Sequence, residues 1–136
     1  MSSSFRSRFS DAAISTVSPA RIIVMCFERV DRDLELAVEA MHSGARESAH
    51  ELCCHAQEII TELLGSLDQS AWEHSSSLAG LYSWALSQLA IGNIRQDAGT
   101  VSDVRAVLAE LQAAFSVAAL PPANAAISAL EGATRA

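Results

Sequence analysis

The chain has 136 residues, about the size of one domain, and half of them are apolar. Its net charge is −7, all of its basic residues are Arg, and no basic stripe is visible, so we expect no nucleic-acid partner and little affinity for anionic membrane surfaces. No stretch of about 18 apolar residues occurs, so no transmembrane helix and no direct membrane insertion are expected.

Residues 1–17 are predicted to form an extended N-terminal arm. Its first ten residues are rich in Ser and Arg and lack the apolar run of a secretory signal peptide. The large apolar residues of the arm are Phe5, Phe9 and Ile14. Two alternatives stay open for them. They either pack against one end of the helical domain or form a detachable cap over an apolar groove that a partner helix occupies.

The first helix is predicted from Pro19 to Met41. Ser18 suits the N-cap position, and Pro19 suits the first turn, where no N–H partner is needed. Apolar residues recur at steps of three and four, with charged residues between them, as expected for an amphipathic helix. This stripe consists of Ile22, Ile23, Cys26, Phe27, Val30, Leu34, Ala37, Val38 and Met41. Gly44 is predicted to end the helix in a left-handed conformation.

A second helix is predicted over residues 45–67, followed by a polar connector over residues 68–77. The third helix is predicted to begin near Leu78, or earlier if Ser70 and Glu73 form a capping box. Its apolar stripe consists of Leu78, Leu81, Tyr82, Ala85, Leu86 and Leu89, with Ile94 as a further candidate.

Residues 95–100 are predicted to form a second turn. Thr100 and Asp103 have the spacing of a capping box for the fourth helix. That helix carries Val104, Val107, Leu108, Leu111, Phe115 and Ala118, and prolines 121 and 122 stop it. For the tail over residues 121–136, a short amphipathic helix and a disordered segment both stay open.

Four amphipathic helices joined by short connectors predict an all-α fold. The expected architecture is an antiparallel up-and-down four-helix bundle over residues 18–120. The arm of residues 1–17 and the tail of residues 121–136 flank this domain.

The three cysteines predict neither a disulfide framework nor a metal centre. Their number is odd and two are adjacent, which favours reduced thiols in a cytoplasmic protein. His50, Cys53 and Cys54 have a spacing that could place metal ligands on one helical face, but Cys53 falls on the apolar stripe and no fourth ligand is evident. We therefore expect no metal and no cofactor.

No catalytic motif is evident, so no enzymatic activity is predicted. One alternative is phosphotransfer, because Ala49-His50-Glu51-Leu52 resembles the Ala-His-x-Leu-Lys-Gly motif of histidine phosphotransfer domains. Cys53 and Cys54 stand where that motif has Lys and Gly. The cation and the steric clearance that the reaction needs are therefore missing, and phosphotransfer through His50 is the second-ranked function.

Several short motifs follow one another along residues 9–118. Residues 14–19 read Ile-Ser-Thr-Val-Ser-Pro, and residues 23–27 read Ile-Val-Met-Cys-Phe. Further on come Leu78-x-x-Leu81-Tyr82 and Leu89-x-x-Gly92-Asn93. In this order and spacing the motifs resemble those of the FliS-type flagellin chaperones. This chain departs from the family pattern by having Phe9, Arg21, Phe27, Gly92 and Phe115 where Tyr, an acidic residue, Tyr, Ala and Trp are usual.

The resemblance implies a cytoplasmic export chaperone, not an enzyme. Such a protein binds the disordered C-terminal segment of flagellin as helices, prevents premature polymerisation and delivers flagellin to the type III export gate of the flagellum. The implied partners are the flagellin C-terminal region and an export gate component, and we expect a monomer or a weak homodimer. The candidate binding residues are Phe9, Ile14, Phe27, Tyr82 and Asn93. Phe27 and Tyr82 suit the core equally well, because an aromatic residue on an apolar stripe usually packs inward.

Overall fold

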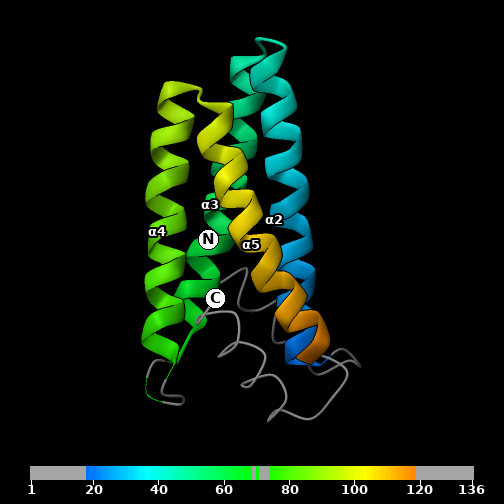
Figure 1. The fold of residues 1–136 in the computed structure, drawn as a ribbon, viewed down its shortest axis with the longest axis vertical. Helices are drawn as coiled ribbons and strands as arrows, with labels where there is room; N and C mark the ends of the chain where they lie inside the picture. The colour runs from blue at the N-terminus through cyan, green and yellow to red at the C-terminus, as the bar shows by residue number, and fades with distance from the viewer. Residues whose placement is uncertain (1–17, 69, 71–73, 119–136) are drawn as a thin grey trace. The chain divides into compact units, whose positions relative to one another are not determined.

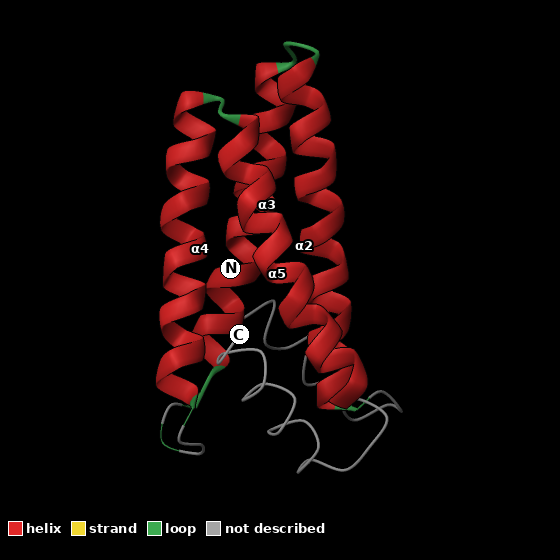
Figure 2. Cartoon of the chain, in the orientation of Figure 1, coloured by secondary structure: helices red, strands yellow, loops and turns green. Residues whose placement is uncertain are grey.

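In the computed structural model, residues 18–68, 70 and 74–118 are described, and every regular element among them is a helix. These elements are α2 (Pro19–His42), α3 (Arg46–Ser66), α4 (Ser75–Arg95) and α5 (Ala98–Ala118), as Figures 1 and 2 show. The predicted all-α class is confirmed, and the helix bounds agree with the prediction to within three residues at most ends. None of the described helices combines the length and the apolar character that a membrane span requires.

The chain divides into two compact units. One comprises residues 1–28 and 108–136, and the other comprises residues 29–107. The second unit holds α3 and α4 together with α2 from Arg29 and α5 up to Val107, and short connectors make its successive helices antiparallel (Figure 2). This arrangement is the predicted up-and-down bundle. The predicted arm and tail lie outside the described residues, so the proposed domain bounds stay a prediction.

Several small residues lie at the centre of the second unit. Ala37, Ala49, Ala56 and Ala85 are fully buried, which allows the helices that carry them to approach closely. Larger side chains fill the remaining core, namely Val30, Leu34, Cys53, Ile60, Tyr82, Leu89, Val101 and Val104. The first unit has its own buried residues, Ile22, Val24, Phe27, Leu108, Leu111 and Ala114.

The ends of α2 follow the sequence prediction. The Ser18 hydroxyl oxygen accepts a hydrogen bond from the N–H of Arg21 at 3.1 Å, as an N-cap residue should. At the other end, Gly44 adopts a positive φ of 78°, and the N–H of Ala45 donates to the carbonyl of Ala40 at 2.8 Å. A left-handed glycine with this hydrogen bond is the Schellman form of helix ending.

The start of α4 corrects one alternative of the sequence analysis. Ser70 does not begin the helix, because its N–H and its hydroxyl both donate to Oδ1 of Asp68, at 3.0 and 2.7 Å. These hydrogen bonds form a local turn ahead of the helix. The helix begins instead at Ser75.

The turn between α4 and α5 is tighter than predicted. It consists of Gln96, which has a left-handed φ of 52°, and Asp97. Asp97 is the N-cap in place of the predicted Thr100, because its Oδ1 accepts hydrogen bonds from the N–H groups of Gly99 and Thr100 at 3.0 and 3.3 Å. The Thr100 hydroxyl donates to Oδ2 at 3.0 Å, and together these hydrogen bonds lower the pKa of Asp97. The cap is therefore ionised at neutral pH.

Candidate functional site

The outward side of α4 carries three exposed large apolar side chains among serines. Trp84 is 38% exposed, Ile91 39% and Ile94 79%. Their spacing of seven and three residues places them within about 80° of one another around the helix. Between Ser75 and Ile94 this helix has no charged residue. We call Trp84, Ile91 and Ile94 the α4 apolar face.

The opposite side of α4 is apolar and buried. Its core side chains are Leu78, Tyr82, Ala85 and Leu89, and the helix packs chiefly against α3. Because only one side of α4 lies against the bundle, a partner that covered Ile94 would gain about 1.5–3 kcal/mol from that side chain.

A polar cluster joins the last turn of α4 to the first turns of α3. The side-chain amide of Asn93 is almost fully buried, and its Nδ2 donates to Nδ1 of His50 at 2.9 Å. Sγ of Cys54 lies beside the imidazole of His50, 3.5 Å from Nε2 and 3.8 Å from Nδ1. Gln96 closes the cluster by donating from Nε2 to the backbone oxygen of Asn93 at 2.9 Å. We call His50, Cys54 and Asn93 the α3–α4 polar cluster.

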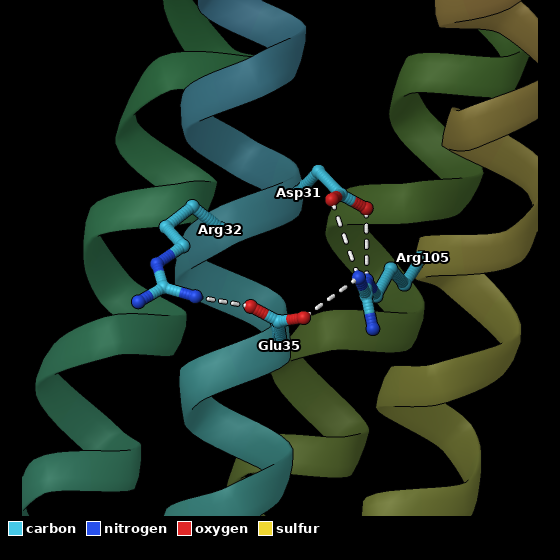
Figure 3. A network of polar contacts seen from close by, with 4 residues as sticks. All are labelled: Asp31, Arg32, Glu35 and Arg105. Atoms are coloured by element: carbon cyan, nitrogen blue, oxygen red, sulfur yellow. Dashed lines mark hydrogen bonds and ion pairs between the residues drawn. The ribbon is translucent and has the colours of Figure 1, made fainter.

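Charged side chains connect α2 to α5 on the surface of the second unit (Figure 3). Arg105 donates from Nε to Asp31 at 2.8 Å, and from Nη2 to Asp31 and Glu35 at 3.3 Å each. Glu35 also pairs with Arg32. The hydrogen bond to Asp31 is the main cause of a raised pKa of Arg105. The charges of two carboxylates and two guanidinium groups cancel in this network. Such a network is better suited to holding α2 against α5 than to acid–base chemistry.

One carboxylate of α2 is buried. Asp33 is 1% exposed, and its Oδ1 lies 3.3 Å from Nε of Arg29, whereas its Oδ2 pairs with Nδ1 of His55 on α3. Both partners reach it from exposed positions. A buried carboxylate needs such partners, since its desolvation costs several kcal/mol. This trio therefore holds α2 against α3.

The residues predicted to bind a partner lie in different surroundings. Phe27 and Tyr82 are each 2% exposed and belong to the core. Asn93 is brought to His50, from which it is 43 residues distant in the chain. Phe9 and Ile14 lie outside the described residues. The roles of these five residues in binding stay predictions.

The metal hypothesis gains no support from the geometry. Among the described residues, no group of three or more His, Cys, Asp or Glu side chains could hold a metal ion. Cys53 is fully buried on the core side of α3, whereas His50 and Cys54 meet on its outer side. Successive helical residues diverge by about 100°, so the three predicted ligands do not converge.

Comparison with known proteins tests the family resemblance that the motifs suggested. The chain matches the family model of flagellar protein FliS over residues 1–121. The chain belongs to the FliS family. The flagellar secretion chaperone FliS of Bacillus subtilis (strain 168) is 26% identical to it over 106 residues, which are 78% of this chain and 79% of that protein. The resemblance drawn from the motifs is thereby confirmed. FliS membership leaves phosphotransfer through His50 as an untested alternative.

In this FliS-family chain, sequence reasoning missed the α4 apolar face. Ile94 was expected as a further member of the buried stripe, but it is the most exposed large hydrophobic residue described. The available signal was the absence of charge between Ser75 and Ile94, together with Trp84 and Ile91 lying off the stripe. The partnership of His50 with Asn93 had no sequence signal, because it depends on how α3 and α4 pack.

Proposed function

We propose that this protein is a flagellar secretion chaperone that binds the C-terminal segment of flagellin as helices. The family match over residues 1–121 and the chaperone name of the Bacillus subtilis relative support this function. Binding would keep the segment from polymerising prematurely. The protein would act by binding and not by catalysis, in accordance with the absence of a catalytic motif from the sequence.

The observation that carries the proposal is the α4 apolar face. An amphipathic helix can bury its apolar side against such a surface. A segment that is disordered when free gives up conformational entropy on folding, so apolar anchors must offset that loss. Ile94 and Ile91 offer such anchors, and Trp84 adds an aromatic surface with an N–H group at its edge.

The site of action follows from the same function. The chaperone would meet newly made flagellin in the cytoplasm and deliver it to a component of the type III export gate. Met25 on α2 is 51% exposed and offers a further apolar contact for flagellin or for the gate. The net charge of −7 argues against nucleic acid as a partner. We propose that the free protein is a monomer or a weak homodimer.

The experiment that tests this function is calorimetric titration with a flagellin from the same organism, run in parallel with a C-terminally truncated flagellin. The expected result is one-to-one binding of the intact flagellin with a negative heat-capacity change, because apolar surface is buried. The truncated flagellin should not bind. Equal binding of both proteins, or of neither, would contradict the proposal.

A further inference from the structure

One side of α3 carries a row of carboxylates. They belong to Glu47, Glu51, Glu58 and Glu62, and we call these four residues the α3 acidic stripe. We propose that the α3 acidic stripe is a docking surface for a basic helix of a further protein partner, whose Arg or Lys side chains pair with the carboxylates. This inference goes beyond the proposed chaperone function, because it concerns a surface other than the α4 apolar face.

The spacing of the four residues places them on one side of the helix. Their intervals of four, seven and four residues keep the carboxylates within about 60° of one another around α3 and spread them over about 22 Å of its length. Glu47, Glu51 and Glu58 are exposed, so their charges are open to a partner. A helix that carries cations at the same intervals can therefore lie alongside α3 and meet the whole stripe.

The α3 acidic stripe has no Arg or Lys to neutralise it. Between Arg46 and Arg95 the sequence contains neither residue type, and within the described part of the chain no ion pair involves the stripe. On α2, by contrast, Asp31, Asp33 and Glu35 each pair with an Arg. Like charges four residues apart destabilise a helix, and the stripe contains two such pairs. The stripe therefore does not serve the stability of α3.

Glu62 indicates that a donor from outside completes the stripe. The residue is only 9% exposed, and its Oε2 is buried without a hydrogen-bond partner among the described residues. A buried carboxylate oxygen loses its hydration, and a donor normally offsets that loss. Glu62 lies at the edge of the stripe nearer His55, from which it is seven residues distant. A guanidinium or ammonium group of a helix that lies on the stripe would supply the missing donor.

The chemistry of the stripe favours a basic polypeptide over a small cation. Carboxylates spread over about 22 Å do not converge on one ion, and among the described residues no group of three or more His, Cys, Asp or Glu side chains could hold a metal. The net charge of −7 attracts a positively charged partner and speeds its association at low salt. Arg suits the site best, because its guanidinium group can donate two parallel hydrogen bonds to one carboxylate.

The test measures the binding of a labelled basic peptide to the full-length protein by fluorescence anisotropy. The matched peptide is an Ala-rich helix of about 20 residues that carries four Arg at the intervals of the α3 acidic stripe. A second peptide has the same composition, but its Arg residues are distributed around the helix. At about 50 mM salt the matched peptide should bind about tenfold more tightly, and the difference should shrink at higher salt. Equal affinities would show only a general attraction to the net charge and would overturn the proposal.

Two double variants locate the contact along the stripe. E58Q/E62Q should weaken binding of the matched peptide by about tenfold, because it removes the buried acceptor together with an exposed one. E47Q/E51Q should weaken it by about threefold, because both of its carboxylates are exposed to solvent. A larger loss in E47Q/E51Q than in E58Q/E62Q would contradict the role assigned to Glu62.

The matched control is E39Q/D103N, which removes two exposed negative charges from α2 and α5. It should leave the affinity for the matched peptide within about twofold of the wild type. A loss as large as that of the pair that includes Glu62 would overturn the proposal. The single variant E62Q should not lower the midpoint of urea denaturation, because its Oε2 has no hydrogen bond to lose. A lower midpoint would show that Glu62 serves the fold, and this too would overturn the proposal.

Discussion

The outward sides of helices α2 and α4 differ in their side chains: that of α2 is mainly charged, and that of α4 carries no charge before Arg95. The outward side of α2 carries Glu28, Arg29, Arg32 and Glu39, whose charges are solvated or paired. The outward side of α4 carries Trp84, Ile91 and Ile94 and has no charge before Arg95. Both helices have a buried apolar stripe on their inner side, and burial of these stripes stabilises the fold in the same way. The difference between the outward sides is what the proposed function predicts, with solvent covering most of the outward side of α2 and flagellin covering that of α4.

Among the charged residues of α2, the buried Asp33 and its partners should contribute most to the unfolding free energy. Replacing both partners of Asp33, as in R29A/H55A, leaves a buried carboxylate without a counter-charge and should cost about 3 kcal/mol of unfolding free energy. D33N removes the charge while keeping the shape, and should cost about 1 kcal/mol. Urea denaturation followed by circular dichroism measures both values.

The matched control for this test is R32A, because Arg32 is exposed and pairs with Glu35 at the surface. Its cost should stay below about 0.5 kcal/mol. If the double variant proved no less stable than D33N, Arg29 and His55 would not be what stabilises the buried acid.

Breaking the apolar face of α4 should affect binding and not stability. I91E/I94E places two charges where flagellin is proposed to dock, and should weaken flagellin binding by about 30- to 100-fold, or about 2–2.8 kcal/mol. The unfolding free energy should change by less than about 0.5 kcal/mol, since both side chains are exposed. Calorimetric titration and urea denaturation give the two quantities.

S48E on α3 is the control for this pair, because Ser48 is exposed and lies outside the α4 apolar face. It should bind flagellin like the wild type. Undiminished flagellin binding by I91E/I94E would show that the α4 apolar face is not the docking surface. The outward side of α4 would then face solvent, as that of α2 does.

The inner side of α4 should tolerate little change where it meets α5. A Cβ at Gly92 would lie 3.0 Å from Cγ2 of Val101, and Val101 is fully buried. G92A should therefore cost about 1–2 kcal/mol of unfolding free energy. V101A also costs stability by itself, because Val101 is fully buried, but it removes the methyl group in the way, so the double variant should lose less than the sum of the two single variants. A thermodynamic cycle of the two single variants and the double variant measures the coupling, and strict additivity would contradict a steric clash.

The smallest effect is expected at the surface of α2, in the network of Figure 3. R105A removes the hydrogen bonds to Asp31 and Glu35 and should cost about 0.5–1 kcal/mol at low salt. The difference from wild type should shrink in 1 M salt, where the Debye length is about 3 Å. Urea denaturation at both salt concentrations checks this. A loss that is independent of salt would mean that packing of the Arg105 stem, and not its charge, joins α2 to α5.

Local chemistry accounts for the parts of the fold that were predicted. Ser18 and Gly44 bound α2 as expected, because capping and left-handed stops depend on a few neighbouring residues. The turn after α4 was misjudged, since Gln96 adopts a left-handed conformation that its residue type does not suggest. Because the chain already turns at Gln96, α5 begins soon afterwards, and Asp97 instead of Thr100 is its N-cap.

The candidate binding residues were less predictable. An aromatic residue on an apolar stripe can face the core or a partner, and Phe27 and Tyr82 both turned out to face the core. Ile94 lies five residues after Leu89, so it points away from the buried stripe, although its neighbours Gly92 and Asn93 are buried. Periodicity reports which residues share a side of a helix and not which sides are covered.

The sequence by itself determined the helical class, the approximate bounds of four helices and, through the order of its motifs, the FliS family. These properties depend on residues near one another in the chain or on motif spacing. Only the tertiary structure decided that His50 meets Asn93, that Asp33 is buried between Arg29 and His55, and that one apolar side of α4 stays open. Each of these depends on which helix faces which and at what height, because side-chain contacts between helices are set by packing and not by separation along the chain.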